Sequence, residues 1–256
     1  MKKKMLLLPP ALAMGMIALS AAPAMADHAE GMYGVTLNEL NSSGATGEAW
    51  IEVVGSEATV TLTASGLAEE FDGNPYPHVQ HIHIGAQGLC PDMDADENGD
   101  GIISTTEGGP SYGDIGTTLS VGDGNKEPDA GVNLEVAPAG STIEYEETFE
   151  LNEATQDALA DGTAVIVVHG LDPATQPEGA TEPSDLVPEL PLAATSPALC
   201  GTLEMQPAGG ADTGVVTAAS STDGGSATSM LALGGALVLA ATGGAFVLGR
   251  RVKATK

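Results

Sequence analysis

Two charge-free apolar segments, one at each end, limit what this sequence can fold into. Residues 5–22 are largely apolar and follow three lysines, and the small residues Ala24 and Ala26 come next. This pattern is typical of a cleaved secretory signal peptide over 1–26. An uncleaved N-terminal anchor is the alternative, but Pro9-Pro10 and the small-residue site argue against it. The part of the chain that folds in water therefore begins near Asp27.

The second apolar segment, residues 230–249, contains twenty residues and no charge. As a helix it would be about 30 Å long, which is the thickness of the hydrocarbon core of a bilayer. The segment 250–256 is basic, and positive residues stay on the cytoplasmic side of a membrane. The sequence therefore predicts a protein of the cell membrane with a single C-terminal span, a cytoplasmic tail at 250–256 and its N-terminal part outside the cell.

Charge is divided sharply between the ends and the middle. All 35 acidic residues lie between Asp27 and Asp223, where Lys126 is the only basic residue, so this stretch carries a formal charge near −34. Such a surface excludes nucleic acid and anionic lipid as partners of the exported part. A high-salt habitat and a surface that collects divalent cations are both consistent with it.

The exported part is predicted to be all-β over residues 27–206. Short segments rich in Val, Ile and Thr alternate with Gly, Pro, Asn and Asp clusters, which favours an antiparallel β-sandwich of Greek-key type. The expected strands are 33–37, 49–54, 58–64, 79–84, 143–151, 164–169 and 198–203. One helix is expected at 153–160, with Asn152 as its N-cap. Residues 207–229 are rich in Gly, Ala, Ser and Thr and predict a flexible tether.

The segment 96–107 matches the twelve-residue EF-hand calcium loop at each diagnostic position. The predicted calcium ligands are Asp96, Asn98, Asp100, the carbonyl of Ile102, Ser104 and Glu107. The flanking Cys90-Pro91 and Gly108-Gly109-Pro110 predict that neither EF-hand helix forms. We therefore expect a surface loop ordered by calcium, not a signalling switch, and an acidic loop without an ion is the alternative.

Histidines and cysteines supply the other candidate site residues. His81 and His83 are two apart, so on a strand they share one face, and His169 ends a separate apolar run. Three such imidazoles can hold copper or zinc, although they could equally bind only water or carbonyl groups. The exported part contains two cysteines, Cys90 and Cys200, and an even count outside the cell favours a disulfide.

Three short motifs resemble those of copper/zinc superoxide dismutases. The segment His78-Val79-Gln80-His81-Ile82-His83 resembles their His-x-x-His-x-His strand, and Val167-Val168-His169 resembles the strand with their last copper ligand. Ala198-Leu199-Cys200-Gly201 resembles their C-terminal cysteine segment, whose partner cysteine lies where Cys90 does. With a calcium-type loop inserted, residues 32–204 look most like the bacterial secreted proteins with a CHRD (chordin-type) domain. The resemblance implies a dismutase-like sandwich, a Cys90–Cys200 disulfide, and copper at His81, His83 and His169, with His78 as a fourth ligand or a support.

Departures from the dismutase pattern argue against catalysis. No histidine lies between His83 and His169, so the dismutase zinc site is missing, and Pro197 stands where those enzymes carry a guiding arginine. A strongly acidic surface would also repel superoxide. The sequence therefore favours a calcium-stabilised binding or metal-binding module at the cell surface without catalysis. A copper-only dismutase-like enzyme and an envelope copper reservoir are the alternatives, and the sequence identifies no extracellular partner.

Overall fold

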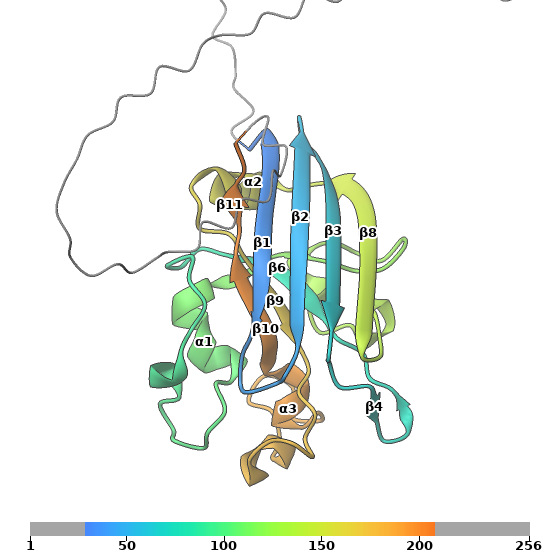
Figure 1. Cartoon of the computed structure of the whole chain (residues 1–256), viewed down its shortest axis with the longest axis vertical. Coiled ribbons are helices and arrows are strands. Elements are labelled where there is room, and N and C mark those ends of the chain that lie inside the picture. Colours follow the sequence, from blue (N-terminus) through green and yellow to red (C-terminus); the bar gives the residue numbers. More distant parts are fainter. Residues whose placement is uncertain (1–28, 208–256) are drawn as a thin grey trace, which may run out of the picture. The chain divides into compact units, whose positions relative to one another are not determined.

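The computed structural model describes residues 29–207 (Figure 1). The predicted signal peptide, all but the first residue of the tether, the membrane span at 230–249 and the tail at 250–256 lie outside these residues. Among the residues described, no helix is both long and apolar enough to cross a bilayer.

Antiparallel strands dominate the described part and form two layers, with β1, β2, β3 and β8 in front of β6, β9 and β10 (Figure 1). The strand order is β7-β6-β9-β10-β1-β2-β3-β8, with β11 paired to β1. Strand β1 belongs to both layers, because it pairs with β2 over Gly31–Leu37 and with β10 at Asn38 and Glu39. The main strands are β1 (Gly31–Glu39), β2 (Thr46–Val54), β3 (Glu57–Ser65), β6 (Gln80–Ile84), β7 (Asp114–Thr118), β8 (Thr142–Glu150), β9 (Val165–His169) and β10 (Pro197–Thr202).

Shorter elements occupy the connections. The short strands are β4 (Glu70–Phe71), β5 (Asn74–Pro75) and β11 (Glu204–Met205). The helices are α1 (Thr105–Tyr112), α2 (Glu153–Ala160) and α3 (Leu192–Thr195), with 3-10 turns η1 (Met93–Ala95), η2 (Pro128–Ala130), η3 (Leu134–Val136) and η4 (Glu178–Thr181).

Alternation along the front strands places the core between the layers. In β3, Ala58, Val60, Leu62 and Ala64 are buried, while the threonines between them face outward. Because a strand side chain changes face at every residue, one face of this layer packs on the core and the other meets solvent. All seven predicted strands are present within one residue or a few of their expected bounds, so the prediction of a mostly antiparallel β fold is confirmed.

Helix α2 confirms its prediction, whereas α1 contradicts the expectation that no helix flanks the calcium-type loop. Asn152 accepts a hydrogen bond from the Thr155 N–H and caps α2 as expected. Helix α1 forms despite its internal Pro110, because Ser104 and Glu107 make a capping box at its N-terminus. A capping box satisfies two backbone N–H groups that would otherwise lack partners, which offsets the weak helix propensity of this glycine-rich segment.

The sequence also failed to indicate β7. This strand contains Gly116 at its centre, and glycine is depleted in strands. A Cβ at Gly116 would lie 2.7 Å from the Thr155 Oγ1 of α2 and 2.9 Å from the Ile84 Cδ1 of β6. Glycine is therefore required there by the close approach of α2, even though it weakens the strand signal.

Strands β6 and β9 are buried on both faces. All five residues of β9 are buried, and so are the first four of β6. Their inner face joins the main core, while a second apolar cluster covers their outer face. This second cluster consists of Tyr112, Val165, Val167 and Cys200, with Leu40 and Cys90 packed against it.

A disulfide joins Cys90 to Cys200, as predicted, across a sequence separation of 110 residues. It ties the β6–β7 connection to β10 beside the second apolar cluster. Closing a loop of about 100 residues restricts the unfolded chain and stabilises the fold by about 4–5 kcal/mol in the chain-entropy model.

We predict that the double substitution Cys90→Ser and Cys200→Ser lowers the free energy of unfolding by about 4 kcal/mol, because the unfolded chain regains the loop entropy. Urea unfolding of the variant and of the oxidised parent protein measures the difference. Reduced parent protein is the matched control and should unfold like the variant. Equal stability of all three forms would contradict this role for the disulfide.

Candidate metal centre

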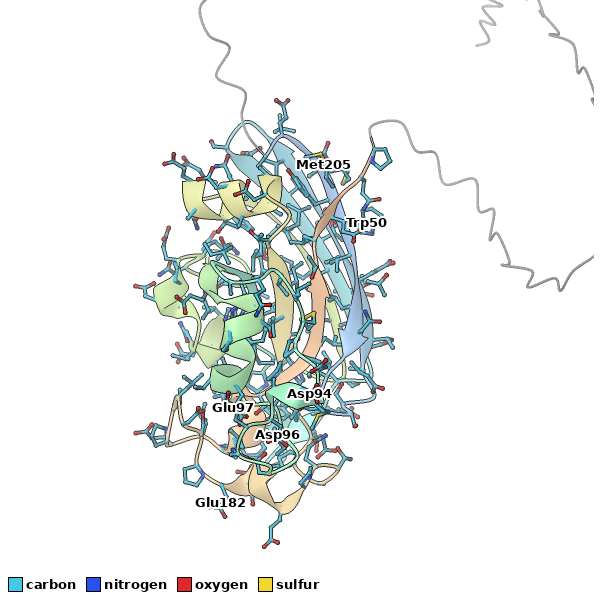
Figure 2. The ribbon with its side chains drawn as sticks, turned by 90° about the vertical axis from the view of Figure 1, so that its left-hand side faces the viewer. Trp50, Asp94, Asp96, Glu97, Glu182 and Met205 are labelled. Carbon is cyan, nitrogen blue, oxygen red and sulfur yellow. A yellow bond between two sulfur atoms is a disulfide. The ribbon has the colours of Figure 1, made fainter. Side chains whose placement is uncertain are left out.

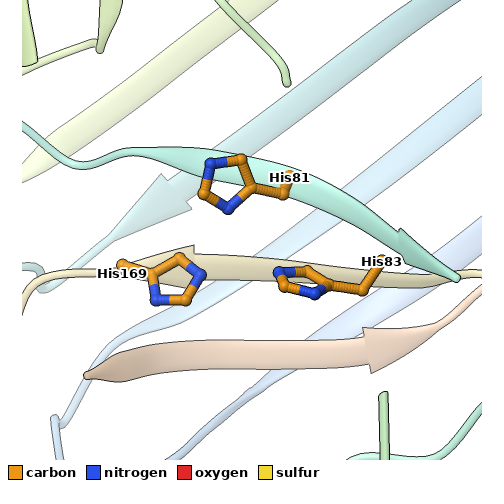
Figure 3. A group of neighbouring side chains, drawn as sticks. All are labelled: His81, His83 and His169. Atoms are coloured by element: carbon orange, nitrogen blue, oxygen red, sulfur yellow. The ribbon is translucent and has the colours of Figure 1, made fainter. Parts of the chain in front are cut away.

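Strand geometry brings His81 and His83 to one face of β6, and that face is turned away from the main core. Ile82, between them, points the other way and joins the main core. His169 ends β9, the antiparallel neighbour of β6, in which Val167 pairs with His81. The predicted convergence of the three histidines is therefore confirmed, and Figure 3 shows their rings turned toward one another across β6 and β9.

The three rings form a compact group. Their centroids are 5.4 Å apart for His81 and His83, 5.1 Å for His81 and His169, and 5.9 Å for His83 and His169. One ring nitrogen from each residue lies within 4.8 Å of the other two, and all three side chains are at most 3 % exposed. Within residues 29–207 no other set of three or more His, Cys, Asp or Glu side chains gathers this closely.

Each imidazole has one nitrogen bonded to a backbone carbonyl and the other without a partner among the described residues. His81 Nε2 donates to Gly131 O at 2.9 Å, His83 Nδ1 donates to Gly113 O at 2.8 Å, and His169 Nδ1 donates to Thr195 O at 2.8 Å. These bonds assign the proton of each neutral ring. The unpartnered atoms are His81 Nδ1, His83 Nε2 and His169 Nε2.

Buried nitrogens without partners are costly, at roughly 1–3 kcal/mol each, and such groups call for an explanation. A metal ion supplies one, because metal-binding histidines typically donate their other N–H to a carbonyl or carboxylate. The alternative, that these histidines bind only water or carbonyls, accounts for the bonded nitrogens, but the described residues offer no carbonyl or donor to the three remaining nitrogens, which lie within 4.8 Å of one another. The residues present therefore fit a metal held by three imidazoles.

Burial keeps these histidines neutral. It lowers the pKa of His83 to about 4 and that of His169 to about 3, in the second case with a further contribution from the charge His83 would carry. Burial also lowers the pKa of His81 well below its usual range, and the neighbouring His169 and His83 add to the effect. Neutral imidazole is the form that binds a metal, so protons compete weakly at neutral pH.

His78 does not join the three rings. Its Nδ1 lies 2.9 Å from His169 O and its Nε2 lies 2.8 Å from Ala68 O, so both nitrogens face carbonyl groups. Gly170, at a φ of +106°, leaves room for it, since a Cβ there would be 2.7 Å from His78 Nδ1. Of the two predicted roles, the support of His169 fits this position, and a fourth ligand does not.

The covering loops hold the rings through residues that sequence analysis missed. Tyr112 packs its ring edge-on against His83, with centroids 4.6 Å apart, and donates its hydroxyl to Thr105 O. Gly131 places its carbonyl beside His81 at a point where a Cβ would lie only 2.4 Å from Ile115 Cδ1. Gly113 likewise has no room for a side chain, because Ile84 O is too close. The glycines in these loops could have indicated the close contacts with the histidines, but glycine is too common in this chain to identify a site.

The calcium-type loop folds with its predicted ligands turned inward. Both Asp96 oxygens accept N–H bonds, from Gly99 and Gly101, and Asp100 Oδ1 accepts from Ile102 N, each at 2.8–2.9 Å. Three more predicted ligands make bonds within the same loop: Asn98 Oδ1 accepts from Asp100 N, and the Glu107 carboxylate accepts from Glu97 N, Asn98 N and Ser104. In the described structure the loop carboxylates do not converge as the histidines do, and calcium stays a proposal.

Comparisons with known proteins give matches among solved structures. No family model matches the chain, and no curated protein matches it. Among solved structures, it is similar to a mutant of superoxide dismutase 5 from Candida albicans, with 12 % sequence identity and a TM-score of 0.38. The match covers 72 % of this chain and 96 % of that one.

We predict that the metal-free protein loses stability as the pH falls from about 6.5 to 5. Four buried histidines, His78, His81, His83 and His169, have pKa values below the 6.5 of an unfolded histidine, so the unfolded chain binds protons first and is favoured. Carboxylates, with usual pKa values near 4, stay mostly ionised over this range. Urea unfolding at several pH values measures the slope.

His83→Gln should flatten this slope, because it removes one buried imidazole, and the curve of the parent protein should be level between about pH 7 and 8. An unchanged slope in the variant would contradict a buried neutral His83.

Proposed function

We propose that residues 29–207 form an extracellular copper-binding domain that does not catalyse dismutation. The observation that supports this most strongly is the convergence of three neutral, buried imidazoles, each with one unpartnered nitrogen within 4.8 Å of the others. His81 Nδ1, His83 Nε2 and His169 Nε2 would hold the ion. Gly131, Gly113 and Thr195 would keep those rings in place through their carbonyls.

A site of three imidazole nitrogens favours copper over zinc, iron and nickel. Imidazole suits copper, zinc, iron and nickel, and among divalent ions copper has the highest affinity for such a site. When bound, copper would supply a one-electron redox centre. The acidic surface would add a long-range attraction for cations, since the stretch 27–223 carries a formal charge near −34.

Two features of the chain argue against rapid dismutation. Superoxide is an anion, and Lys126 is the only basic residue within 29–207. Its ammonium group donates to the carbonyls of Ser120 and Gly122 and lies over the rings of Tyr145 and Phe149. These contacts hold the ammonium group in place. Nothing in the described part therefore guides an anion to the histidines.

Further parts of the proposal depend on the sequence motifs. The chain would belong with CHRD-type surface proteins, exported through its signal peptide and held by a single span at 230–249, with an extracellular partner yet to be found. Calcium in the 96–107 loop would hold α1 and its flanking residues in place. Figure 2 shows Asp94, Asp96 and Glu97 of this region at the same end of the molecule as Glu182, which adds to the negative potential there.

We predict that the purified mature protein binds one copper ion per chain and that His81→Gln, His83→Gln or His169→Gln abolishes this binding, because each removes one of three ligands. Copper analysis after dialysis, together with the visible and paramagnetic-resonance spectra of the copper(II) form, measures the outcome. His78→Gln separates support from ligation: its nitrogens face carbonyls, one of them that of His169, so it should still bind one copper, although less tightly than the parent protein.

A superoxide assay on the copper-loaded protein then distinguishes a copper-binding module without catalysis from a dismutase-like enzyme. We expect a rate close to that of a no-protein blank. A fast rate that disappears in His81→Gln would instead favour the copper-only dismutase-like enzyme. Failure of all forms to retain copper would overturn the proposal itself.

We predict that calcium raises the melting temperature of the protein and that a chelator reverses this. An ion at 100 times its dissociation constant adds about 2.7 kcal/mol to stability. Glu107→Gln should remove the calcium response, since it loses the bidentate carboxylate while glutamine can still complete the capping box of α1.

Glu97→Gln is the control for this experiment, because residue 97 occupies a non-ligand position of the loop and its side chain is exposed. The control should respond to calcium like the parent protein. Equal responses of both variants, or a chelator effect matched by salt alone, would contradict a calcium site.

A further inference from the structure

A polar hollow lies where β1 and β2 meet β10, β11 and Cys90 of the β6–β7 connection. Its volume is about 570 Å³. Two strand glycines, Gly34 and Gly201, are among its lining residues. The side chains around it combine one aromatic ring with hydrogen-bonding groups: Trp50, Glu48, Thr36, Asn38 and Gln206.

Trp50, the only tryptophan of the chain, forms one wall of this hollow. It pairs with Gly34 across β1 and β2, and a Cβ at Gly34 would lie 2.5 Å from Trp50 Cζ3 and 2.8 Å from Cε3. The six-membered ring therefore occupies the space that a side chain at Gly34 would fill, and 43 % of the Trp50 side chain is exposed. Figure 2 shows Trp50 on the outside of this layer, near Met205.

A second, shallower hollow continues from the first. Its volume is about 380 Å³, and it is lined by residues of β2, β3 and β8, including Gly47, Thr63 and Glu144. The two hollows share Glu48, whose carboxylate has no hydrogen-bond donor among the described residues. Together they make a groove across β1, β2, β3 and β8, which at the usual strand spacing is about 14 Å long.

The chemistry of this groove selects among ligands. It contains carboxylates and hydroxyls but no basic group, so it repels anions. A caged cation needs aromatic faces on more than one side, whereas Trp50 is the only aromatic side chain lining either hollow. A flat indole beside hydrogen-bonding side chains matches a pyranose ring, which has a C–H face and a rim of hydroxyls.

We propose that this groove binds a neutral oligosaccharide. One sugar ring would stack on the exposed face of Trp50, while Glu48 and Asn38 hydrogen-bond to its hydroxyls, the carboxylate forming the stronger, charge-assisted bonds. Neighbouring sugars would extend over Thr63 and Glu144 along the second hollow. Neither hollow is lined by His81, His83 or His169, and the site does not depend on the copper proposal.

The single tryptophan makes the test direct, because emission of the mature protein reports on Trp50 alone. Titration with cellohexaose, chitohexaose and mannohexaose should give a saturable blue shift for at least one sugar. Calorimetry with that sugar should then show about tenfold weaker binding in Trp50→Ala, the loss of one stacking partner. Val54→Ala, on the same strand and face but outside both hollows, should bind like the parent protein.

A second variant keeps the indole but moves it. Gly34→Ala would push the Trp50 ring off its position, so binding should weaken although the tryptophan remains. Polygalacturonate should produce no shift. The proposal is overturned if no neutral sugar shifts the emission, if Trp50→Ala binds as tightly as the parent, or if only tetramethylammonium chloride or protein self-association produces the shift.

Discussion

The burial of β6 and β9 on both faces is the constraint from which most of this structure follows. Strands with one face on a core usually leave the other to water, but here the second face carries Val165, Val167 and three histidines. That face must be covered, and a two-layer sandwich offers nothing to cover it. The β6–β7, β7–β8 and β9–β10 connections provide the cover, which explains why they are long and why a disulfide ties the first of them down.

The same three connections supply the carbonyls that orient the histidines. Gly113 lies in the first connection, Gly131 in the second and Thr195 in the third, so each imidazole is fixed by a different loop. Because Lys126 is the only Lys or Arg within 29–207, nearly all acidic side chains there lack a partner of opposite charge. Neutral contacts between side chain and backbone, together with the apolar clusters, therefore carry the stability that ion pairs supply in other proteins.

Much of the fold and of the histidine group could be predicted from local patterns. Short segments rich in Val, Ile and Thr identified seven strands, and the spacing of His81 and His83 placed them on one face because strand geometry has a period of two. The two misses differ in cause. Strand β7 depends on the approach of α2 to Gly116, a contact between segments distant in the sequence, whereas α1 depends on the capping box of Ser104 and Glu107, which are only three residues apart. The carbonyl partners were beyond prediction, since a backbone oxygen leaves no mark on the sequence.

Because of this arrangement, the candidate metal centre can exist only in the folded chain. The ligands come from two strands and their carbonyl partners from three loops, separated by up to 114 residues between His81 and Thr195. In the metal-free protein the loops hold three nitrogen lone pairs close together without donors, at a cost that packing and the disulfide must offset. An ion that bound these nitrogens would remove that cost, and it would stabilise the folded chain to the extent that it binds this chain more tightly than the unfolded one. Metal binding and the packing of the three connections over the outer face of β6 and β9 would then stabilise each other. The loops that bury the histidines would also hold them in position to bind the metal.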